Sequence, residues 1–93
     1  MQKLDQRRAD ADKEQRAYFI AVIALHSEQC PISPPTELSA WAKDAVKNVD
    51  DQTLNAAATR AKDNLNKHEL GVAAWCRNNT GMAFPLYASI VLK

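Results

Sequence analysis

Apolar residues are unevenly distributed along the chain, and their spacing divides it into helices. Residues 1–16 are polar on all sides and carry five basic and four acidic side chains in mixed order. The nine residues from Ala17 to Leu25 are all apolar, which a helix of a soluble protein tolerates only where neighbours surround it. We therefore expect a polar helical arm over residues 1–16 that continues into the core and ends near Glu28.

A proline-rich corner follows this first helix. Pro31, Pro34 and Pro35 cannot continue a helix. After the corner, residues 36–48 place apolar side chains at helical spacing, with Thr36 as the expected N-cap. Asp50 or Asp51 can then cap the next helix.

The clearest helical pattern lies in residues 54–76. Apolar positions recur there every three or four residues, and the stripe keeps its phase through Gly71. This pattern predicts one long helix to about Asn79, with Gly81 as its C-terminal stop. The apolar tail from Met82 onward favours a fourth helix with Pro85 in its first turn, although its last residues alone would suit a strand.

Length and composition favour an all-α fold. Ninety-three residues allow one small domain, and the 46% hydrophobic and 25% charged fractions are those of a globular protein. Two glycines and four prolines are too few for many short strands. We predict an all-α, compact three- or four-helix bundle with an extended polar N-terminal helix, divided into an arm (1–16) and a single helical domain (17–93).

The charge pattern argues against nucleic acid and membrane partners. The net charge is +1, and acidic and basic residues are interspersed, so no basic face for nucleic acid or anionic lipid is expected. The apolar run of nine residues is about half of the roughly 20 that span a bilayer as a helix, so we expect no direct membrane insertion. The acidic residues before this run and the absence of a cleavage pattern after it also argue against a signal peptide.

The two cysteines are expected to form a disulfide. Up-down-up threading of three helices brings the ends of the first and third helices together, and Cys30 and Cys76 lie there. Such a bond would stabilise a small exported domain by roughly 4 kcal/mol. The alternative is a pair of buried thiols in a cytosolic protein.

A metal site is not expected, although His26, Cys30, His68 and Cys76 would make a Cys₂His₂ set. Eight residues of continuous helix separate His68 from Cys76 by about 12 Å along the axis, too far for two ligands of one ion. A zinc site would need a break at Gly71. We instead expect His68 to be a hydrogen-bonded residue of the core-facing stripe and His26 to be a cation at a helix C-terminus.

No motif predicts catalysis or cofactor binding. Phosphate-binding glycine loops, nucleophile elbows and His-Glu-x-x-His sequences are absent from the sequence, so we expect no enzyme and no cofactor. The alternative is a cytosolic helix-turn-helix-like DNA-binding or regulatory module. In that case Asn55, Thr59, Arg60 and Lys62 would face DNA.

The tail offers more apolar residues than one docked helix can bury, so part of it is expected to meet a protein partner or a second copy in a homodimer. The candidate partner-binding residues are Phe84, Leu86, Tyr87, Ile90 and Leu92. By exclusion, the sequence predicts a small non-enzymatic protein-binding module of the inhibitor, immunity or chaperone type. We expect a periplasmic or otherwise exported or membrane-tethered domain stapled by one disulfide, with the cytoplasm as the alternative location.

Overall fold

The computed structural model describes the backbone of residues 2–92 and the side chains of residues 12–92, and within this part it contains helices and no strand. The α-helices are α1 (Gln2–Gln29), α2 (Thr36–Ala45), α3 (Asp51–Asn66), α4 (Gly71–Asn78) and α5 (Phe84–Val91). A 3₁₀ turn, η1 (Val46–Asn48), follows α2, and a π-helix, η2 (Asn79–Ala83), joins α4 to α5. The predicted all-α class is confirmed.

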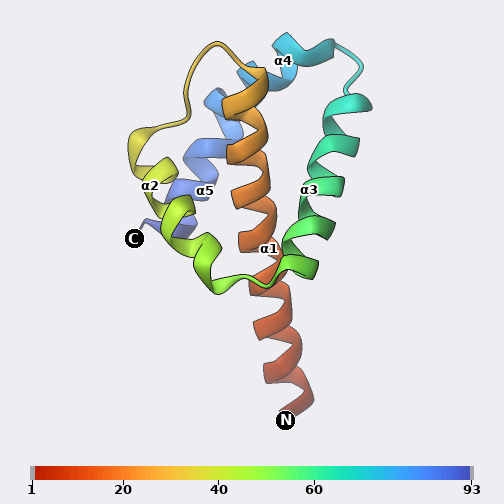
Figure 1. Cartoon of the computed structure of the whole chain (residues 1–93), viewed down its shortest axis with the longest axis vertical. Helices are drawn as coiled ribbons and strands as arrows, with labels where there is room; N and C mark the ends of the chain where they lie inside the picture. The colour runs from red at the N-terminus through yellow and green to blue at the C-terminus, as the bar shows by residue number, and fades with distance from the viewer. Residues whose placement is uncertain (1, 93) are drawn as a thin grey trace.

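Helix α1 is the centre of the bundle (Figure 1). Helices α2 and α3 lie on opposite sides of it, and each packs against it. The chain then crosses the end of the bundle through α4 and returns along α5, which packs against α2. None of the helices in the described residues is long and apolar enough to cross a membrane.

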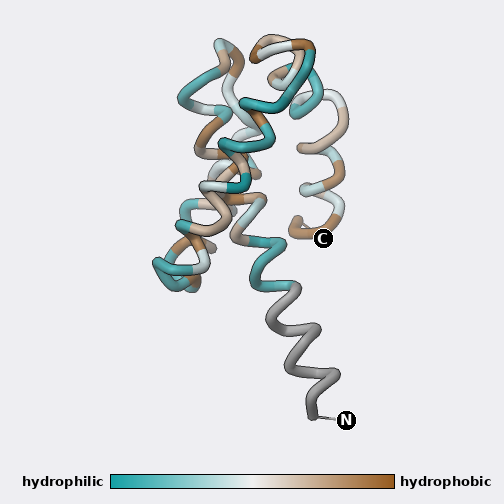
Figure 2. The backbone as a smooth tube through the Cα atoms, turned by 90° about the vertical axis from the view of Figure 1, so that its right-hand side faces the viewer, coloured by the Kyte–Doolittle hydropathy of each residue, from teal (hydrophilic) through white to brown (hydrophobic). Residues whose placement is uncertain are grey.

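The change from polar to apolar residues in α1 coincides with the start of the core. Residues 12–16 are exposed, whereas Ala17 is fully buried. The side chains of residues 1–11, which form most of the predicted arm, lie outside the described residues. Figure 2 shows the same change in hydropathy where α1 enters the bundle. All but one residue of the apolar run is buried or half-buried, so the other helices cover it on nearly every side.

Helix α3 begins at a well-formed cap. The backbone N–H of Thr53 donates to Asp50 Oδ2 over 3.0 Å, which satisfies one of the free donors of the first turn. Lys13 forms an ion pair with the same carboxylate, and it acts with Thr53 to hold the pKa of Asp50 below its ordinary value. The predicted cap of α2 is wrong, because Thr36 lies inside that helix and Pro35 precedes it without a side-chain cap.

The predicted single helix from residue 51 to 79 is also wrong. Helix α3 ends at Asn66, and a short turn leads to Gly71, whose φ of 86° only glycine adopts at little cost. The N–H of Gly71 donates to the carbonyl of His68, which closes the turn. The apolar stripe keeps its phase across this break because Leu65 in α3 and Trp75 in α4 face the same core.

The C-terminal tail is helical, as predicted, but Gly81 does not end the preceding helix. It lies inside η2, and the backbone stays right-handed from α4 into α5. Pro85 occupies the first turn of α5, where its missing N–H is tolerated.

The two glycines should therefore respond in opposite ways to alanine. Gly71→Ala should lower the free energy of unfolding by about 1 to 2 kcal/mol, because a Cβ is strained at positive φ. Gly81→Ala should leave it unchanged or raise it by up to about 1 kcal/mol, because an added Cβ there meets no atom within 4 Å and alanine is the better helix former. Urea denaturation of both variants measures the difference, and equal effects would contradict the distinct conformations of the two sites.

Candidate functional site

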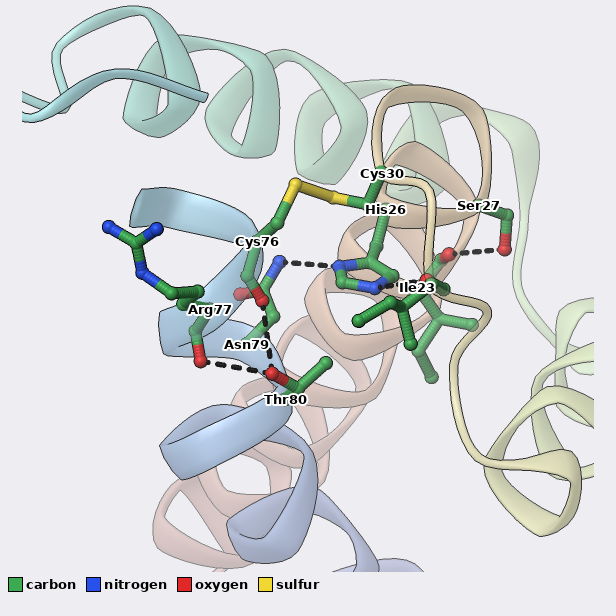
Figure 3. The surroundings of a disulfide bond; sticks show 9 residues. Ile23, His26, Ser27, Cys30, Cys76, Arg77, Asn79 and Thr80 are labelled. Atoms are coloured by element: carbon green, nitrogen blue, oxygen red, sulfur yellow. Dashed lines mark hydrogen bonds between the residues drawn. A yellow bond between two sulfur atoms is a disulfide. The ribbon is translucent and has the colours of Figure 1, made fainter. Parts of the chain in front are cut away.

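A disulfide joins the first and fourth helices at one end of the bundle. Cys30 directly follows α1, and Cys76 lies in α4, with 5.8 Å between their Cα atoms and a sequence separation of 46. Figure 3 shows the bond lying between the end of α1 and α4. The predicted pairing is present, although the helix that carries Cys76 is a separate one after the break at Gly71.

His26 lies one helical turn before Cys30 and is fully buried. Its Nε2 donates to the carbonyl oxygen of Ile32 in the proline-rich corner over 2.9 Å, and its Nδ1 accepts from the Asn79 amide over 3.2 Å. The Ile32 carbonyl can only accept, so the proton lies on Nε2 and the lone pair on Nδ1. The ring thereby connects three segments of the chain (Figure 3).

The protonation state of His26 differs from the sequence prediction. Burial lowers the pKa of His26 below its ordinary value, and the hydrogen bond to Ile32 opposes this shift only in part. The imidazole is therefore neutral at pH 7, and the expected helix C-terminal cation is wrong. The last turn of α1 does hold this histidine, but the ring points into the core, where it forms a T-shaped contact with Phe84 at 4.8 Å between ring centres.

Asn79 is the polar residue of the π-helix that sequence reasoning missed. Its side chain is 3% exposed, and its amide meets His26 from the opposite wall of the core. A π-helix inserts an extra residue into a helical turn and is frequent at functional sites. No sequence pattern distinguishes Asn79 from its neighbour Asn78, because the insertion shifts the phase of the helix.

A cavity of about 200 Å³ lies beside the disulfide. His26, Cys30 and Cys76 form part of its wall, and Arg77 and Thr80 line it from the side of α4 and η2. The side chain of Arg77 is exposed, and its guanidinium points away from the two sulfurs (Figure 3).

His68 does not join this cluster. The structure brings together His26, Cys30 and Cys76, whose ligand atoms all lie within 4.8 Å of one another. His68 lies instead in the turn after α3, and its buried Nδ1 has no hydrogen-bond partner among the described residues. The expected hydrogen bond of that nitrogen is therefore absent, because the side chain follows the turn and not the predicted continuous stripe.

The structure divides the predicted partner-binding residues into two groups. Phe84 and Tyr87 are 1% and 7% exposed and belong to the core, so they are not available to a partner. Burial raises the pKa of Tyr87 to about 12. The other three, Leu86, Ile90 and Leu92, are among the exposed large hydrophobic residues.

Met82 completes the exposed group. It is 71% exposed, and with Leu86 and Ile90 it forms a line of residues four positions apart on the outer face of η2 and α5. We call these three residues the apolar ridge. The four-residue spacing is visible in the sequence, but a helix stop at Gly81 with a restart around Pro85 leaves Met82 outside both helices, whereas the structure places it in η2. Residues 78–92 contain no charged side chain, although a quarter of the whole chain is charged.

Helices α2 and α3 do not have the arrangement of a helix-turn-helix. In that motif the two helices pack against each other, whereas here α1 lies between them (Figure 1). One of the expected DNA-facing residues, Arg60, places its guanidinium 5.3 Å from the centre of the Tyr18 ring on α1.

Comparisons with protein-family models, with curated proteins and with solved structures find no match to this chain.

Proposed function

We propose that this chain is a small, non-enzymatic helical module that binds another protein through the apolar ridge. The observation that carries the proposal is the exposure of Met82 and Leu86, at 71% and 57%, on a helix segment without charged residues. Large apolar side chains that share one face without charges are typical of protein interfaces. Their burial by a partner would remove this surface from water.

The shape of the ridge favours a helix as the partner element. Residues four positions apart form the ridges that pack into the grooves of a second helix. The adjacent line of Gly81, Pro85 and Ser89 is exposed and carries small or compact side chains, so it would let a partner helix approach closely. An amphipathic helix can pack its own apolar side chains against the ridge.

The Cys30–Cys76 disulfide supports an exported location. Disulfides persist in the periplasm and outside the cell, and they are rare in the reducing cytosol. This one ties the end of α1 to α4, which leads through η2 into the helix that carries the ridge. A covalently stapled scaffold would present the ridge in one fixed orientation, as an inhibitor, immunity protein or periplasmic chaperone requires.

A photo-crosslinking amino acid in place of Leu86 tests the proposal in cells that export and oxidise the protein. We expect a discrete adduct with a partner protein, and we expect Met82→Glu in the same chain to abolish it, because a charge on the ridge opposes burial. An adduct of twice the chain mass would identify the partner as a second copy.

The matched control carries the crosslinker in place of Thr59, an exposed residue of α3. Crosslinking of the same strength from both positions would show nonspecific contact and contradict the proposal. So would the absence of an adduct from position 86 in the oxidised, folded protein.

A further inference from the structure

The cluster of His26, Cys30 and Cys76 has the composition of a zinc site with three protein ligands. We propose that the dithiol form of this chain binds one Zn²⁺ through these residues, and that zinc binding and the disulfide exclude each other. The inference does not depend on the proposed protein-binding role. It concerns the end of the bundle around the disulfide, whereas the apolar ridge lies on η2 and α5.

The ligand atoms are already close to the distances that zinc requires. Ligands at about 2.3 Å for sulfur and about 2.0 Å for nitrogen lie roughly 3.3 to 3.8 Å from one another around a tetrahedral ion. The three atoms here lie within 4.8 Å of one another. Once the bond is reduced, the sulfurs must move apart and the imidazole must approach by about 1 Å. Cys30 can accommodate this movement because it follows the end of α1 and is only half-buried.

His26 is held in the orientation and tautomer that a metal ligand needs. Histidine ligands usually donate their second ring N–H to a carbonyl or carboxylate, which leaves the other nitrogen free to bind the ion. Nε2 of His26 makes such a bond to the Ile32 carbonyl. Nδ1 carries the lone pair on the side of α4, where Cys76 lies (Figure 3). Its 3.2 Å contact with the Asn79 amide is the one bond that zinc would replace.

The cavity beside the disulfide supplies the fourth position. Its volume of about 200 Å³ holds water readily, and the three ligands form part of its wall. Two thiolates balance the charge of Zn²⁺.

The disulfide form and the zinc-bound form interconvert by reduction and oxidation of the two sulfurs. A thiol reductant, two RSH per disulfide, becomes RSSR and delivers two electrons and two protons to the sulfurs of Cys30 and Cys76. Zinc binding then releases the two thiol protons to solvent. In the reverse direction, a disulfide oxidant takes two electrons from the thiolates, the S–S bond forms again, and the ion leaves.

Cobalt titration of the reduced protein tests this inference. With air excluded and a phosphine as reductant, Co²⁺ should bind one per chain and give the intense near-ultraviolet absorption of sulfur-to-cobalt charge transfer. Zn²⁺ should displace it. The oxidised protein should show no such band. His26→Gln should weaken binding at least about tenfold, whereas His68→Gln, which removes the histidine outside the cluster, should leave affinity unchanged.

Several results would overturn the inference. The absence of the charge-transfer band or a ratio of two chains per ion would contradict it. Equal affinity of the His26→Gln and His68→Gln proteins for Co²⁺ would also contradict it, because the thiols would then bind the ion without the histidine. Circular dichroism records whether each reduced protein is folded. If His26→Gln unfolds, Cys76→Ser in a chain with His26 intact serves as the second variant, and retention of the full cobalt affinity there would also refute the site.

Discussion

Replacement of both cysteines by serine should lower the free energy of unfolding by about 4 kcal/mol. The bond closes a loop of 46 positions, and in the chain-entropy model the cost of unfolding rises because the cross-linked chain gains less freedom. A small domain is stable by only about 5 to 15 kcal/mol in total, so the loss is a large part of its stability. Urea denaturation of the oxidised protein and the double variant measures it.

Two controls separate the bond from the side chains. Reduction of the unchanged protein in a metal-free buffer should reproduce most of the loss, whereas the same reductant should leave the double variant unaffected. Intact mass after alkylation should show no adduct before reduction and two after it. A loss below about 1 kcal/mol would mean that the unfolded chain is not restricted by the bond, contrary to the entropic argument.

The sequence predicts the parts of the fold that depend on local polarity. The onset of the core at Ala17 follows from the change between residues 16 and 17, and the corner at Pro31–Pro35 follows from proline geometry. The break before Gly71 could not be predicted in the same way. Two helices on either side of a turn can face the same core, so an unbroken spacing of apolar residues does not require an unbroken helix.

Prediction of the site from the sequence is limited in the same way. The pairing of Cys30 with Cys76 needs only the coarse direction of the helices, and it was predictable. The neutral state of His26 depends on its burial in the folded chain, and its two hydrogen-bond partners, the Ile32 carbonyl and the Asn79 amide, lie 6 and 53 positions away in sequence. The π-helix that turns Asn79 inward has no local sequence signature, so the residues that complete the site were visible only in the folded chain.

Substitutions on the two faces of α5 should differ strongly in their effect on the free energy of unfolding. Phe84→Ala should lower the free energy of unfolding by about 3 to 5 kcal/mol, because the ring is 1% exposed and its loss leaves a cavity in the core. The ring packs against His26 at 4.8 Å and Tyr87 at 6.1 Å between centres. Tyr87 in turn stacks on Phe19 of α1 at 3.8 Å. The substitution therefore removes the ring contact of α5 with His26 of α1, whereas the stack of Tyr87 on Phe19 is left in place.

Leu86→Ala is the matched control on the same helix. Its side chain is 57% exposed, so the substitution should change the free energy of unfolding by no more than about 0.5 kcal/mol. Urea denaturation of the oxidised proteins compares the two directly. Because both residues lie within one turn of α5, local helix propensity cannot produce a large difference, and only burial can. A similar cost for both would mean that Leu86 is covered in the folded protein, which would remove the apolar ridge from the surface and with it the basis of the proposed binding role.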